Sequence, residues 1–457
     1  MSSTVALQNM RAFYNNGGTR SYTFRKQQLK KLKQALLQHE EEIYEALYAD
    51  LKKSREEAYL TELGLILAEI RTILKNLRQW MKPKPVTTNL FNFASSSSIY
   101  RDSLGVVLVI SPWNFPLQLA LMAAAGAMAG GNCVVIKPSE LAPATAAILQ
   151  KIITASFPPE YVCVAQGDGA EVVTEMMESF RFDHIFFTGS VGVGRAVYEL
   201  AAPKLIPVTL ELGGKTPAIV EADANIDIAA KRIAVGKYTN SGQICIAPDY
   251  ILVHTSVKEK LLKALIKAIK SFYGDDPGIS YDYGKIINKK RFDKLLNYLQ
   301  QGNIVAGGRY TAASLFLEPT IMDGISLESE LMKEEIFGPV LPVIPFETME
   351  EALAVIAINP NPLALYLFTT DKKKEHAWIS TVPFGGGCIN NTLVHFSNPS
   401  LPFGGVGNSG IGHYHGKYSF ELFTRPKAVL KSPTWFDPSL KYPSFKEKLR
   451  IIKMILR

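Results

Sequence analysis

The feature of this chain that most restricts its fold is a regular alternation of short apolar segments with helical segments, which begins near residue 104. The first four apolar segments are GVVLVIS, NCVVIKP, YVCVAQG and HIFFTGS. Strands that are apolar along their whole length are typical of a parallel sheet with helices on both faces. The alternation therefore predicts an α/β domain built on a parallel sheet.

A second alternation follows residue 211 and predicts a second α/β domain. Its segments are TPAIVE, YILVHT, a helix at 256–273, PVLPVIPF and LALYLFTT. Upstream, the apolar spacing of residues 24–51 and 56–80 is typical of helices, and two prolines then end this helical region. The polar stretch 85–103 favours β-structure and is interpreted as an arm that pairs elsewhere. With 457 residues, the chain is too long for one ordinary domain.

Charge and cysteine content exclude several functional classes. The 50 Lys and Arg residues stand against 42 Asp and Glu residues and form no long basic run, so nucleic-acid binding is not expected. The four cysteines form no CxxC pair and have no metal-ligand spacing with histidine, which predicts neither a disulfide framework nor a metal site. A reducing cytosol suits such a chain, and no signal peptide opens it. The longest apolar region, 104–136, is interrupted by prolines and polar residues and favours a buried strand, loop and helix over a membrane span.

Cys245 lies in the segment KYTNSGQICIAPDY, which spans residues 237–250. Small and polar residues precede it, and Gly242 allows the backbone to approach a ligand closely. A cysteine attacks only as the thiolate, so a reactive thiol needs surroundings that lower its pKa or a base nearby. The segment alone leaves two interpretations open, a catalytic nucleophile or a buried structural cysteine.

Two segments at predicted strand ends have residue types suited to a nucleotide. FFTGSVGVGRAV, residues 186–197, combines a strand, a glycine-rich turn and a helix start, so that backbone N–H groups can face a phosphate. Its glycine order is not GxGxxG, and a purely structural turn is an equal alternative. IKPSE, residues 136–140, places Lys137 and Glu140 where a strand gives way to a helix. Glu140 is interpreted as an acceptor for a ribose hydroxyl or, alternatively, as a helix N-terminal charge.

Three further segments contain candidate catalytic or binding side chains. SPWNFP, residues 111–116, holds Asn114 between two prolines, where its amide could donate to an oxyanion or make an ordinary turn hydrogen bond. TLELGGKTPAIV places Glu211 in an apolar setting, where a raised pKa would suit a general base. Its GKT run resembles the end of a P-loop, but Thr209 stands in place of the first glycine, which excludes an NTPase. KEEIFGPVLPV sets two carboxylates beside Phe337, a pattern that suits a sugar hydroxyl and a ring, or simply a solvated helix end.

Taken together and in their order along the chain, these segments resemble the aldehyde dehydrogenase superfamily. The matching segments span residues 100–425 and are SPWNFP, IKPSE, FTGSVGVG, ELGGK, GQICIAPDY, EEIFGPV and LPFGGVGNSGIGHYHGKYSFELFT. Each segment is a weak signal by itself, whereas the ordered set is highly specific. The short N-terminus, APDY after the cysteine and YHGKYSF near the end are similar to the class 3 and fatty aldehyde dehydrogenase branch.

The resemblance implies a role for each candidate catalytic side chain. Cys245 would be the nucleophile, Glu211 the general base, and Asn114 an oxyanion donor beside the cysteine's own backbone N–H. The implied reaction is NAD(P)-dependent oxidation of an aldehyde to the carboxylic acid, through a cysteine thiohemiacetal and a thioester that Glu-activated water hydrolyses. Medium or long aliphatic, or aromatic, aldehydes are the implied substrates. Two alternatives are a coenzyme-A-acylating enzyme, whose relatives lack this glutamate, and a non-catalytic binding protein on the same fold.

The resemblance also assigns the cofactor, NAD or NADP, to a defined set of residues. In chain order they are Trp113, Lys137, Glu140, Gly189, Ser190, Gly194, Leu212, Glu335 and Phe337. Lys137 and Glu140 would bind the adenosine ribose, and Glu335 the nicotinamide ribose. Glu140 should repel a 2′-phosphate and favour NAD, although class 3 relatives often accept both cofactors. Val191 departs from the family pattern, in which many members have threonine.

The same resemblance divides the chain into domains. Residues 1–84 and 104–211 would form a Rossmann-like NAD(P)-binding domain, and residues 212–410 an α/β catalytic domain. Segments 85–103 and 417–430 would form a small bridging sheet for oligomerisation, as in the family's dimers. We therefore expect a cytoplasmic homodimer whose small-molecule partner is an aldehyde.

The last segment, PSFKEKLRIIKMILR at residues 443–457, lies beyond these motifs. Phe445, Leu449, Ile452 and Ile455 share a helical face among Lys and Arg residues, which predicts a basic amphipathic helix. The segment is too short and too charged to span a membrane. It is expected either to pack on the protein's own body or to dock on an anionic membrane, which would make the enzyme membrane-associated.

Overall fold

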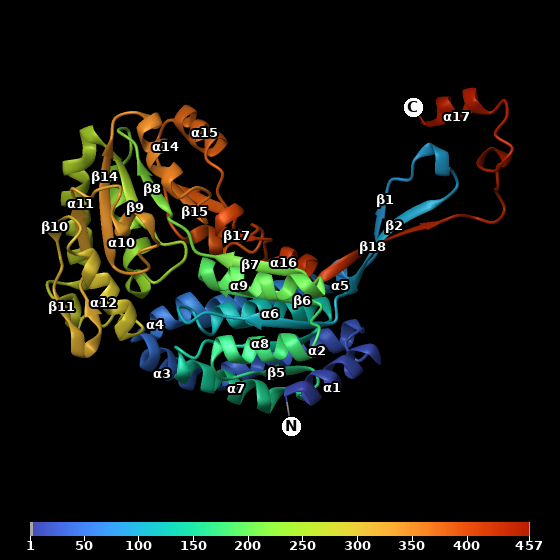
Figure 1. The fold of residues 1–457 in the computed structure, drawn as a ribbon, viewed down its shortest axis with the longest axis horizontal. Coiled ribbons are helices and arrows are strands. Elements are labelled where there is room, and N and C mark those ends of the chain that lie inside the picture. Colours follow the sequence, from blue (N-terminus) through green and yellow to red (C-terminus); the bar gives the residue numbers. More distant parts are fainter. Residues whose placement is uncertain (1–2, 457) are drawn as a thin grey trace.

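The structure, a computed structural model, describes residues 3–456, which form two lobes and a projecting arm (Figure 1). The first lobe is built on a six-stranded sheet with the order β17-β7-β6-β3-β4-β5. The strands are β3 (Val106–Ile110), β4 (Cys133–Lys137), β5 (Val162–Val164), β6 (His184–Gly189), β7 (Val208–Leu212) and β17 (Gly410–Ile411). Neighbouring strands are parallel except β17, which pairs antiparallel with β7. The four apolar segments expected to be strands are strands of this sheet, and the α/β fold class is confirmed.

Helices before and between these strands cover the sheet. They are α1 (Ser3–Asn15), α2 (Tyr22–Gln38), α3 (Glu40–Leu51), α5 (Gly64–Trp80), α6 (Gln118–Gly130), α7 (Pro143–Ser156), α8 (Gly169–Ser179) and α9 (Val191–Ala201). Every residue of α6 is buried, because this helix lies against β3 and β4 and is itself covered by α2 and α5. That position explains why the longest apolar region of the chain needs no membrane.

The N-terminal helical region differs in detail from the expectation. Residues 24–51 are divided between α2 and α3, because the backbone at His39 leaves the helical conformation and serves as the cap of both helices. The region 56–80 contains α4 (Arg55–Ala58), a π-helical turn, η1 (Tyr59–Leu63), and α5. The π-helical turn has no signature in the apolar spacing, and it lies close to the functional site described below.

The second lobe is built on a seven-stranded sheet with the order β10-β13-β14-β9-β8-β15-β16. Its strands are β8 (Pro217–Val220), β9 (Tyr250–His254), β10 (Asn303–Ala306), β13 (Thr320–Asp323), β14 (Val340–Phe346), β15 (Ala364–Phe368) and β16 (Gly386–Ile389). All neighbours are parallel except β10 and β13. The helices are α10 (Ile226–Tyr238), α11 (Lys258–Tyr273), α12 (Lys289–Tyr298), α13 (Glu330–Lys333), α14 (Met349–Ile358) and α15 (Lys372–Thr381). A two-stranded ribbon joins β11 (Tyr310–Thr311) to β12 (Phe316–Leu317), and the four apolar segments expected after residue 211 are β8, β9, β14 and β15.

The arm is a three-stranded antiparallel sheet that stands clear of both lobes in Figure 1. It contains β1 (Lys84–Val86), β2 (Ser96–Ser103) and β18 (Thr424–Lys431), and β2 pairs with β18 along its full length. The expectation of a strand over 417–430 is wrong at its start, because residues Gly416–Leu422 form helix α16. Phe420 of α16 is buried, and the buried carboxylate of Glu69 accepts a hydrogen bond from the N–H of Gly416, so contacts with α5 and α6 favour a helix here.

The C-terminal tail packs on the arm. Its helix, α17 (Leu449–Leu456), is shorter than the expected helix at 443–457, since residues 443–448 are not helical and Arg457 lies outside the described residues. None of the eight residues of α17 is buried. The tail contacts η2 (Leu90–Asn92) at the tip of the arm, and the rings of Phe93 and Phe436 meet edge to face at 5.8 Å. Within residues 3–456, no helix is both long and apolar enough to cross a membrane.

Candidate active site

A cavity of about 650 Å³ lies between the two lobes and is lined by residues of both sheets. The first lobe contributes the loop after β3, the turn after β6 and the end of β7, and the second contributes the loops after α10 and α13. The cavity brings together Trp113, Asn114, Gly189, Ser190, Glu211, Leu212, Cys245, Glu335 and Phe337 from the residues singled out in the sequence. Lys137, Glu140 and Gly194 do not line it.

Cys245 follows a tight turn, η4 (Thr239–Gly242), at the end of α10. Gly242 has a φ of +75°, and a Cβ at this position would stand 2.3 Å from the carbonyl oxygen of Gly338. The glycine is therefore required for close approach of two protein backbones, rather than of backbone and ligand as the sequence suggested. The cysteine itself is only partly buried and lines the cavity.

The surroundings of Cys245 hold its thiol in the protonated form. Burial raises the pKa of the thiol, and the negative charges of Glu335 and Glu211 raise it further. Hydrogen bonds from the backbone N–H groups of Cys245 and Ile246 act in the opposite direction without outweighing burial. Because only the thiolate attacks, a group that accepts the proton is needed in the same cavity.

Glu211, at the end of β7, is the group best placed for that task. Its side chain is buried, and neither carboxylate oxygen has a hydrogen-bond partner among residues 3–456. Burial alone raises the pKa of this carboxyl group well above its ordinary value. A carboxylate that is buried, unpaired and open to a cavity is suited to general base catalysis near neutral pH.

Asn114 occupies the loop between β3 and α6, where it is 2% exposed. Its side-chain Nδ2 donates to the carbonyl oxygen of Gln243 at 3.0 Å. The side chain of Gln243 is in turn fixed by the carbonyl of Lys285 and the N–H of Ile287, each at 3.0 Å. One amide hydrogen of Asn114 is thus anchored, and the other is available to a ligand in the cavity.

Glu335 also presents an unpaired oxygen to the cavity. Its Oε1 is buried without a hydrogen-bond partner in the described part of the chain, and its other oxygen lies against the backbone of Gly213, where a Cβ would approach it to 2.0 Å. Burial raises the pKa of Glu335 to about 8, and the negative charge of Asp249 adds to the effect. A hydrogen bond from the backbone of Gly214 acts in the opposite direction, so the carboxyl group has one amide donor, while Oε1 lacks the donor that a buried carboxyl oxygen normally has.

Three charged residues hold the Glu335 segment in place, and the sequence did not indicate their role. Arg291 of α12 donates to the backbone carbonyls of residues 335, 336 and 337. Asp249 accepts from the N–H of Ile336 at 3.0 Å and forms a buried ion pair with Lys215. Asp249 stands in the APDY motif and could have been suspected from it, whereas Arg291 looks like any cation on an amphipathic helix.

The turn after β6 presents an open helix N-terminus to the cavity. Ser190 caps α9, and a Cβ on Gly192 would meet nothing within 4 Å. Thr188, just before the turn, has a buried hydroxyl without a partner among the described residues. Free N–H groups and an orphaned hydroxyl suit a phosphate-bearing ligand with sugar hydroxyls.

Of the remaining residues predicted to bind the nucleotide, some line the cavity and others lie outside its wall. The ring of Trp113 meets that of Phe337 edge to face at 5.2 Å and forms one wall of the cavity. Lys137, at the end of β4, pairs with Glu140 at 3.0 Å, outside the cavity wall. Gly194 is buried, and a Cβ there would lie 2.5 Å from the side chain of Leu212, so it permits α9 to pack on β7.

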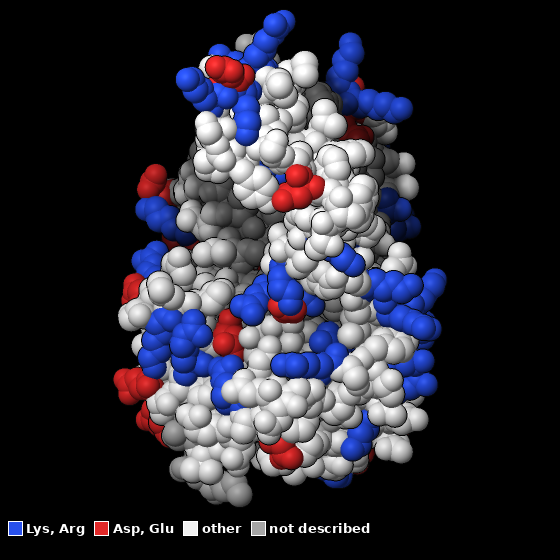
Figure 2. Space-filling view, turned by 90° about the vertical axis from the view of Figure 1, so that its right-hand side faces the viewer, with Lys and Arg blue, Asp and Glu red and all other residues white. Residues whose placement is uncertain are grey.

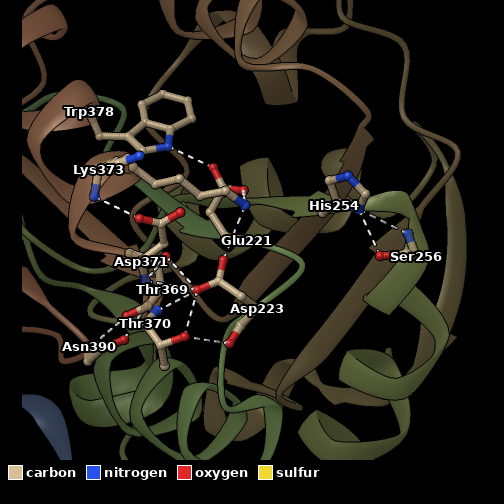
Figure 3. Close-up of polar contacts among 11 residues, drawn as sticks. Glu221, Asp223, His254, Ser256, Thr369, Thr370, Asp371, Lys373, Trp378 and Asn390 are labelled. Atoms are coloured by element: carbon tan, nitrogen blue, oxygen red, sulfur yellow. Dashed lines mark hydrogen bonds and ion pairs between the residues drawn. The ribbon is translucent and has the colours of Figure 1, made fainter.

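A second group of polar side chains lies at the ends of β8 and β15 and differs from the cavity in its pairing (Figure 3). Glu221 accepts from the indole N–H of Trp378 at 2.8 Å and from Lys374 at 2.7 Å. Asp223 accepts from the hydroxyl and N–H groups of residues 369–371 at 2.6–3.0 Å and from Lys374 at 3.2 Å. These carboxylates are satisfied within the protein. In residues 3–456, no group of three or more His, Cys, Asp or Glu side chains is placed to hold a metal ion.

The chain matches known proteins over nearly its whole length. The family model described as "Aldehyde dehydrogenase family" matches residues 5–429. The chain is 45% identical over 449 residues to the 4,4'-diaponeurosporen-aldehyde dehydrogenase of Staphylococcus aureus, which covers 98% of this chain and 97% of that protein. It is 42% identical over 439 residues to a protein of Canis lupus familiaris named aldehyde dehydrogenase, dimeric NADP-preferring, with 96% of each covered. A solved structure described as the substrate-bound state of Staphylococcus aureus AldH has a TM-score of 0.97 and 44% identity, and covers 99% of both chains.

Proposed function

The chain belongs to the aldehyde dehydrogenase family and oxidises aldehydes to acids with NAD or NADP, and we propose that Cys245, Glu211 and Asn114 perform this chemistry. The proposal rests on a single observation above all others. Glu211 is a buried carboxylate that lines the same cavity as Cys245 and has no hydrogen-bond partner for either oxygen within residues 3–456. A carboxylate kept unpaired in this way is available to remove a proton from the thiol and, later, from water.

The first step forms a bond between the sulfur of Cys245 and the aldehyde carbon. The thiol pKa is raised by burial, so its proton must leave as the bond forms, and Glu211 accepts it. Negative charge then develops on the former carbonyl oxygen. The free amide N–H of Asn114 and the backbone N–H of Cys245 donate hydrogen bonds to this oxygen, and such donors stabilise it most when they are rigidly held.

The residues present in the cavity fit a dinucleotide cofactor. The orphaned oxygens of Glu335 and Thr188 would gain partners from ribose hydroxyls, and the open N-terminus of α9 would receive the pyrophosphate. Trp113 and Phe337 would pack against the nicotinamide. NAD(P), when bound, would accept a hydride from the sulfur adduct, and loss of this hydride would turn the adduct into a thioester.

The second half of the reaction releases the acid by hydrolysis. After Glu211 has released the thiol proton to solvent, it removes a proton from water as the water oxygen bonds to the acyl carbon. The carbon–sulfur bond then breaks, and the proton on Glu211 passes to the departing sulfur to restore the thiol. A coenzyme-A-acylating enzyme would use a thiol in place of water and would need no buried base at this position. The unpaired carboxylate of Glu211 therefore favours hydrolysis.

Stopped-flow absorbance of the reduced nicotinamide tests these assignments. Wild type is expected to turn over continuously, and Cys245→Ala to give no signal. Glu211→Gln is expected to give one slowed turnover, because the thiol has lost its base, followed by a near halt, because water has lost the same base. Asp223→Asn, in the satisfied cluster of Figure 3, serves as a carboxylate control outside the cavity and should behave as wild type. A signal from Cys245→Ala equal to that of wild type would refute the proposal.

We infer that the substrates are medium or long aliphatic, or aromatic, aldehydes. Leu119, Ile358, Phe403 and Tyr414 give the cavity an apolar wall, which favours a hydrocarbon chain or ring over a polar metabolite. The relative from Staphylococcus aureus is named for 4,4'-diaponeurosporen-aldehyde. The ratio kcat/KM is expected to rise from acetaldehyde to octanal and benzaldehyde, and a constant ratio along this series would contradict the inference.

We propose that the arm joins two copies of the chain. Leu90, Phe93, Val429 and Leu430 are exposed on the arm in the isolated chain, and exposed apolar side chains of this density are typical of an interface. The canine relative is named dimeric. Sedimentation velocity should give the mass of a homodimer, and a sedimenting monomer at micromolar concentration would contradict this proposal.

We further propose that the tail docks on anionic membranes from the cytoplasmic side. Phe445, Leu449, Ile451, Met454 and Leu456 are exposed, and Lys and Arg outnumber Asp and Glu on the face that contains the arm and the tail (Figure 2). An exposed basic amphipathic helix binds such surfaces. Full-length protein should pellet with phosphatidylglycerol vesicles but not with phosphatidylcholine vesicles, whereas a chain ending at residue 442 should pellet with neither. Equal pelleting of both chains with the anionic vesicles would contradict the proposal.

A further inference from the structure

A buried ion pair from the N-terminal helices touches the loop that contains Asn114. Lys53 follows α3, and Glu62 belongs to the π-helical turn η1. Both side chains are fully buried, and the distance from Lys53 Nζ to Glu62 Oε1 is 2.6 Å. Nothing in the motifs of the sequence connects either residue with catalysis, and neither lines the cavity.

The two partners hold opposite ends of the Asn114 loop. Lys53 Nζ donates to the backbone carbonyl of Asn114 at 3.2 Å and lies 4.1 Å from the centroid of the Phe115 ring. Leu117 and Gln118 lie at the start of α6, and their N–H groups donate to Glu62 Oε2 at 2.9 and 3.1 Å. The pair therefore spans the loop from the asparagine to the helix that follows it.

The same N-terminal segment also contacts the loop of the nucleophile. Glu57 accepts a hydrogen bond from the N–H of Asn240 at 2.8 Å. The side chain of Asn240 donates to the carbonyl of Asn114 at 2.9 Å, so this carbonyl receives two donors from two different elements. Residues 53–62 thus link the loop of Asn114 with the turn that precedes Cys245.

A buried ion pair is weak support for stability alone, because the loss of hydration offsets much of the attraction between the charges. Apolar residues of similar size often stabilise a fold as well or better. Single π-helical turns are also uncommon and frequent at functional sites. These observations favour a geometric role for Lys53 and Glu62 over a purely stabilising one.

We propose that Lys53 and Glu62 are positioning residues for the reaction, which fix the Asn114 loop so that the asparagine amide meets the aldehyde oxygen. The inference rests on the proposed role of Asn114 as an oxyanion donor. Both bond-forming steps at the substrate carbon pass through an oxyanion, so misplacement of the amide lowers the rate of either step. A displacement of about 1 Å at such a donor lowers rates by up to about a hundredfold.

The experiment compares Lys53→Met, Glu62→Leu and the double variant with wild type. Each single variant leaves one charge buried without its partner, so a lower Tm is expected of both. The double variant removes both charges and should recover part of the lost Tm, because the N–H groups of Leu117 and Gln118 still lack their acceptor. Its kcat/KM for aldehyde is nevertheless expected to stay about tenfold to a hundredfold below wild type. Glu62→Gln, which keeps the shape of the side chain, gives a second route to the same rate measurement if a single variant fails to fold.

Two further readouts separate positioning from general damage. The affinity for NAD and the rate of Cys245 alkylation by iodoacetamide should change by less than about twofold, because neither depends on the amide of Asn114. Lys374→Met breaks an ion pair between a 37% exposed lysine and the buried Glu221, outside the cavity, and should lower Tm by less without lowering kcat/KM. Recovery of both Tm and kcat/KM in the double variant would overturn the inference.

Asn114→Ala separates the oxyanion role of Asn114 from the positioning role of Lys53 and Glu62. Full activity of Asn114→Ala would refute the proposed oxyanion role itself. Loss of activity in Asn114→Ala, together with wild-type activity of the double variant Lys53→Met with Glu62→Leu, would refute only the positioning role. Loss in both, with unchanged NAD affinity and thiol reactivity, is the expected result.

Discussion

Two regions of the molecule each contain a pair of carboxyl groups at the ends of parallel strands or in the loops beside them. The two pairs differ in whether their oxygens have hydrogen-bond donors within the protein. In the cavity between the lobes, Glu211 and one oxygen of Glu335 have no hydrogen-bond partner within the described part of the chain. At the ends of β8 and β15, Glu221 and Asp223 receive donors on every oxygen (Figure 3). Each region contains a buried carboxyl group, Glu211 in the first and Glu221 in the second, so burial alone does not distinguish these two.

The difference in pairing has opposite electrostatic consequences. Burial raises the pKa of Glu211 with nothing to oppose it. Burial also raises the pKa of Glu335, where the charges of Arg291 and Lys215 and a hydrogen bond from the backbone of Gly214 oppose it without outweighing it. Burial also acts to raise the pKa of Asp223, but hydrogen bonds from Thr370, Thr369 and Lys374 outweigh it and hold the pKa below its ordinary value. A satisfied carboxylate stabilises the fold in its charged form, whereas an unsatisfied one is left for a ligand, a proton or water. The unpaired groups therefore mark the functional site.

The largest expected contrast is between Glu211→Gln and Asp223→Asn in steady-state activity. Removal of a general base lowers kcat by about a hundredfold to ten-thousandfold, and the glutamine cannot accept a proton. Asp223 lies outside the cavity, so its replacement should leave kcat within about twofold of wild type. Initial rates at saturating aldehyde and NAD measure both variants, and equal losses in the two would break the comparison.

The pH dependence of wild-type activity sharpens the same contrast. Because the pKa of Glu211 is raised, the carboxyl group becomes protonated as pH falls through a value above the ordinary range near about 4.3. The acid limb of kcat/KM should therefore lie above that range and remain in place in Asp223→Asn. An acid limb of kcat/KM with its midpoint at the ordinary pKa of a glutamate would argue against the unpaired environment of Glu211.

A smaller effect, on stability, is expected at the satisfied cluster. Asp223→Asn weakens charge-assisted hydrogen bonds and should lower the free energy of unfolding by about 1–2 kcal/mol near neutral pH. Since the folded-state pKa of Asp223 is depressed, its contribution is present above the unfolded pKa of 3.8 and disappears as pH falls below that value. Urea unfolding at neutral and acidic pH measures the change. A deficit that persists unchanged at acidic pH would not fit this explanation.

The smallest effect is expected at Glu335, and it has the opposite sign with pH. The folded-state pKa of Glu335 is about 8, so its stabilising contribution is complete below the unfolded pKa and is lost as pH rises through about 8. Glu335→Gln should match wild type at pH about 5 and exceed it by about 1 kcal/mol at pH about 9, because cavity water screens much of the charge. Thermal unfolding at the two pH values checks this prediction. A variant that is less stable than wild type at the higher pH would contradict it.

Much of the fold follows from local apolar patterns, and the exceptions depend on distant contacts. The strands β3, β4 and β15 are short and fully buried, with apolar residues at nearly every position, because both faces of their sheets are covered at these strands, and such segments are visible without a structure. Residues 416–422 are helical instead because Glu69, in a distant helix, accepts the N–H of Gly416. The break at His39 interrupts a pattern whose apolar spacing continues on both sides.

The candidate site was predictable where a residue lies in a motif and not where it acts through another residue. Asn114, Glu211, Cys245 and Glu335 were selected from their segments and all line one cavity. Arg291 lines the cavity and donates to backbone carbonyls of the Glu335 segment, contacts that leave no local pattern in the sequence. The same holds for the ion pair of Lys53 and Glu62, which reaches the Asn114 loop across more than fifty residues of chain.

Acyl-enzyme accumulation in Glu211→Gln is the most direct test of the central claim, that an unpaired buried carboxylate activates the water that releases the product. Intact-mass spectrometry of this variant, mixed with octanal and NAD, should show the mass of one octanoyl group on the protein. Digestion should place the group on Cys245, and wild type under the same conditions should show little or none. An unmodified Glu211→Gln protein that still produces octanoic acid at the wild-type rate would contradict the account.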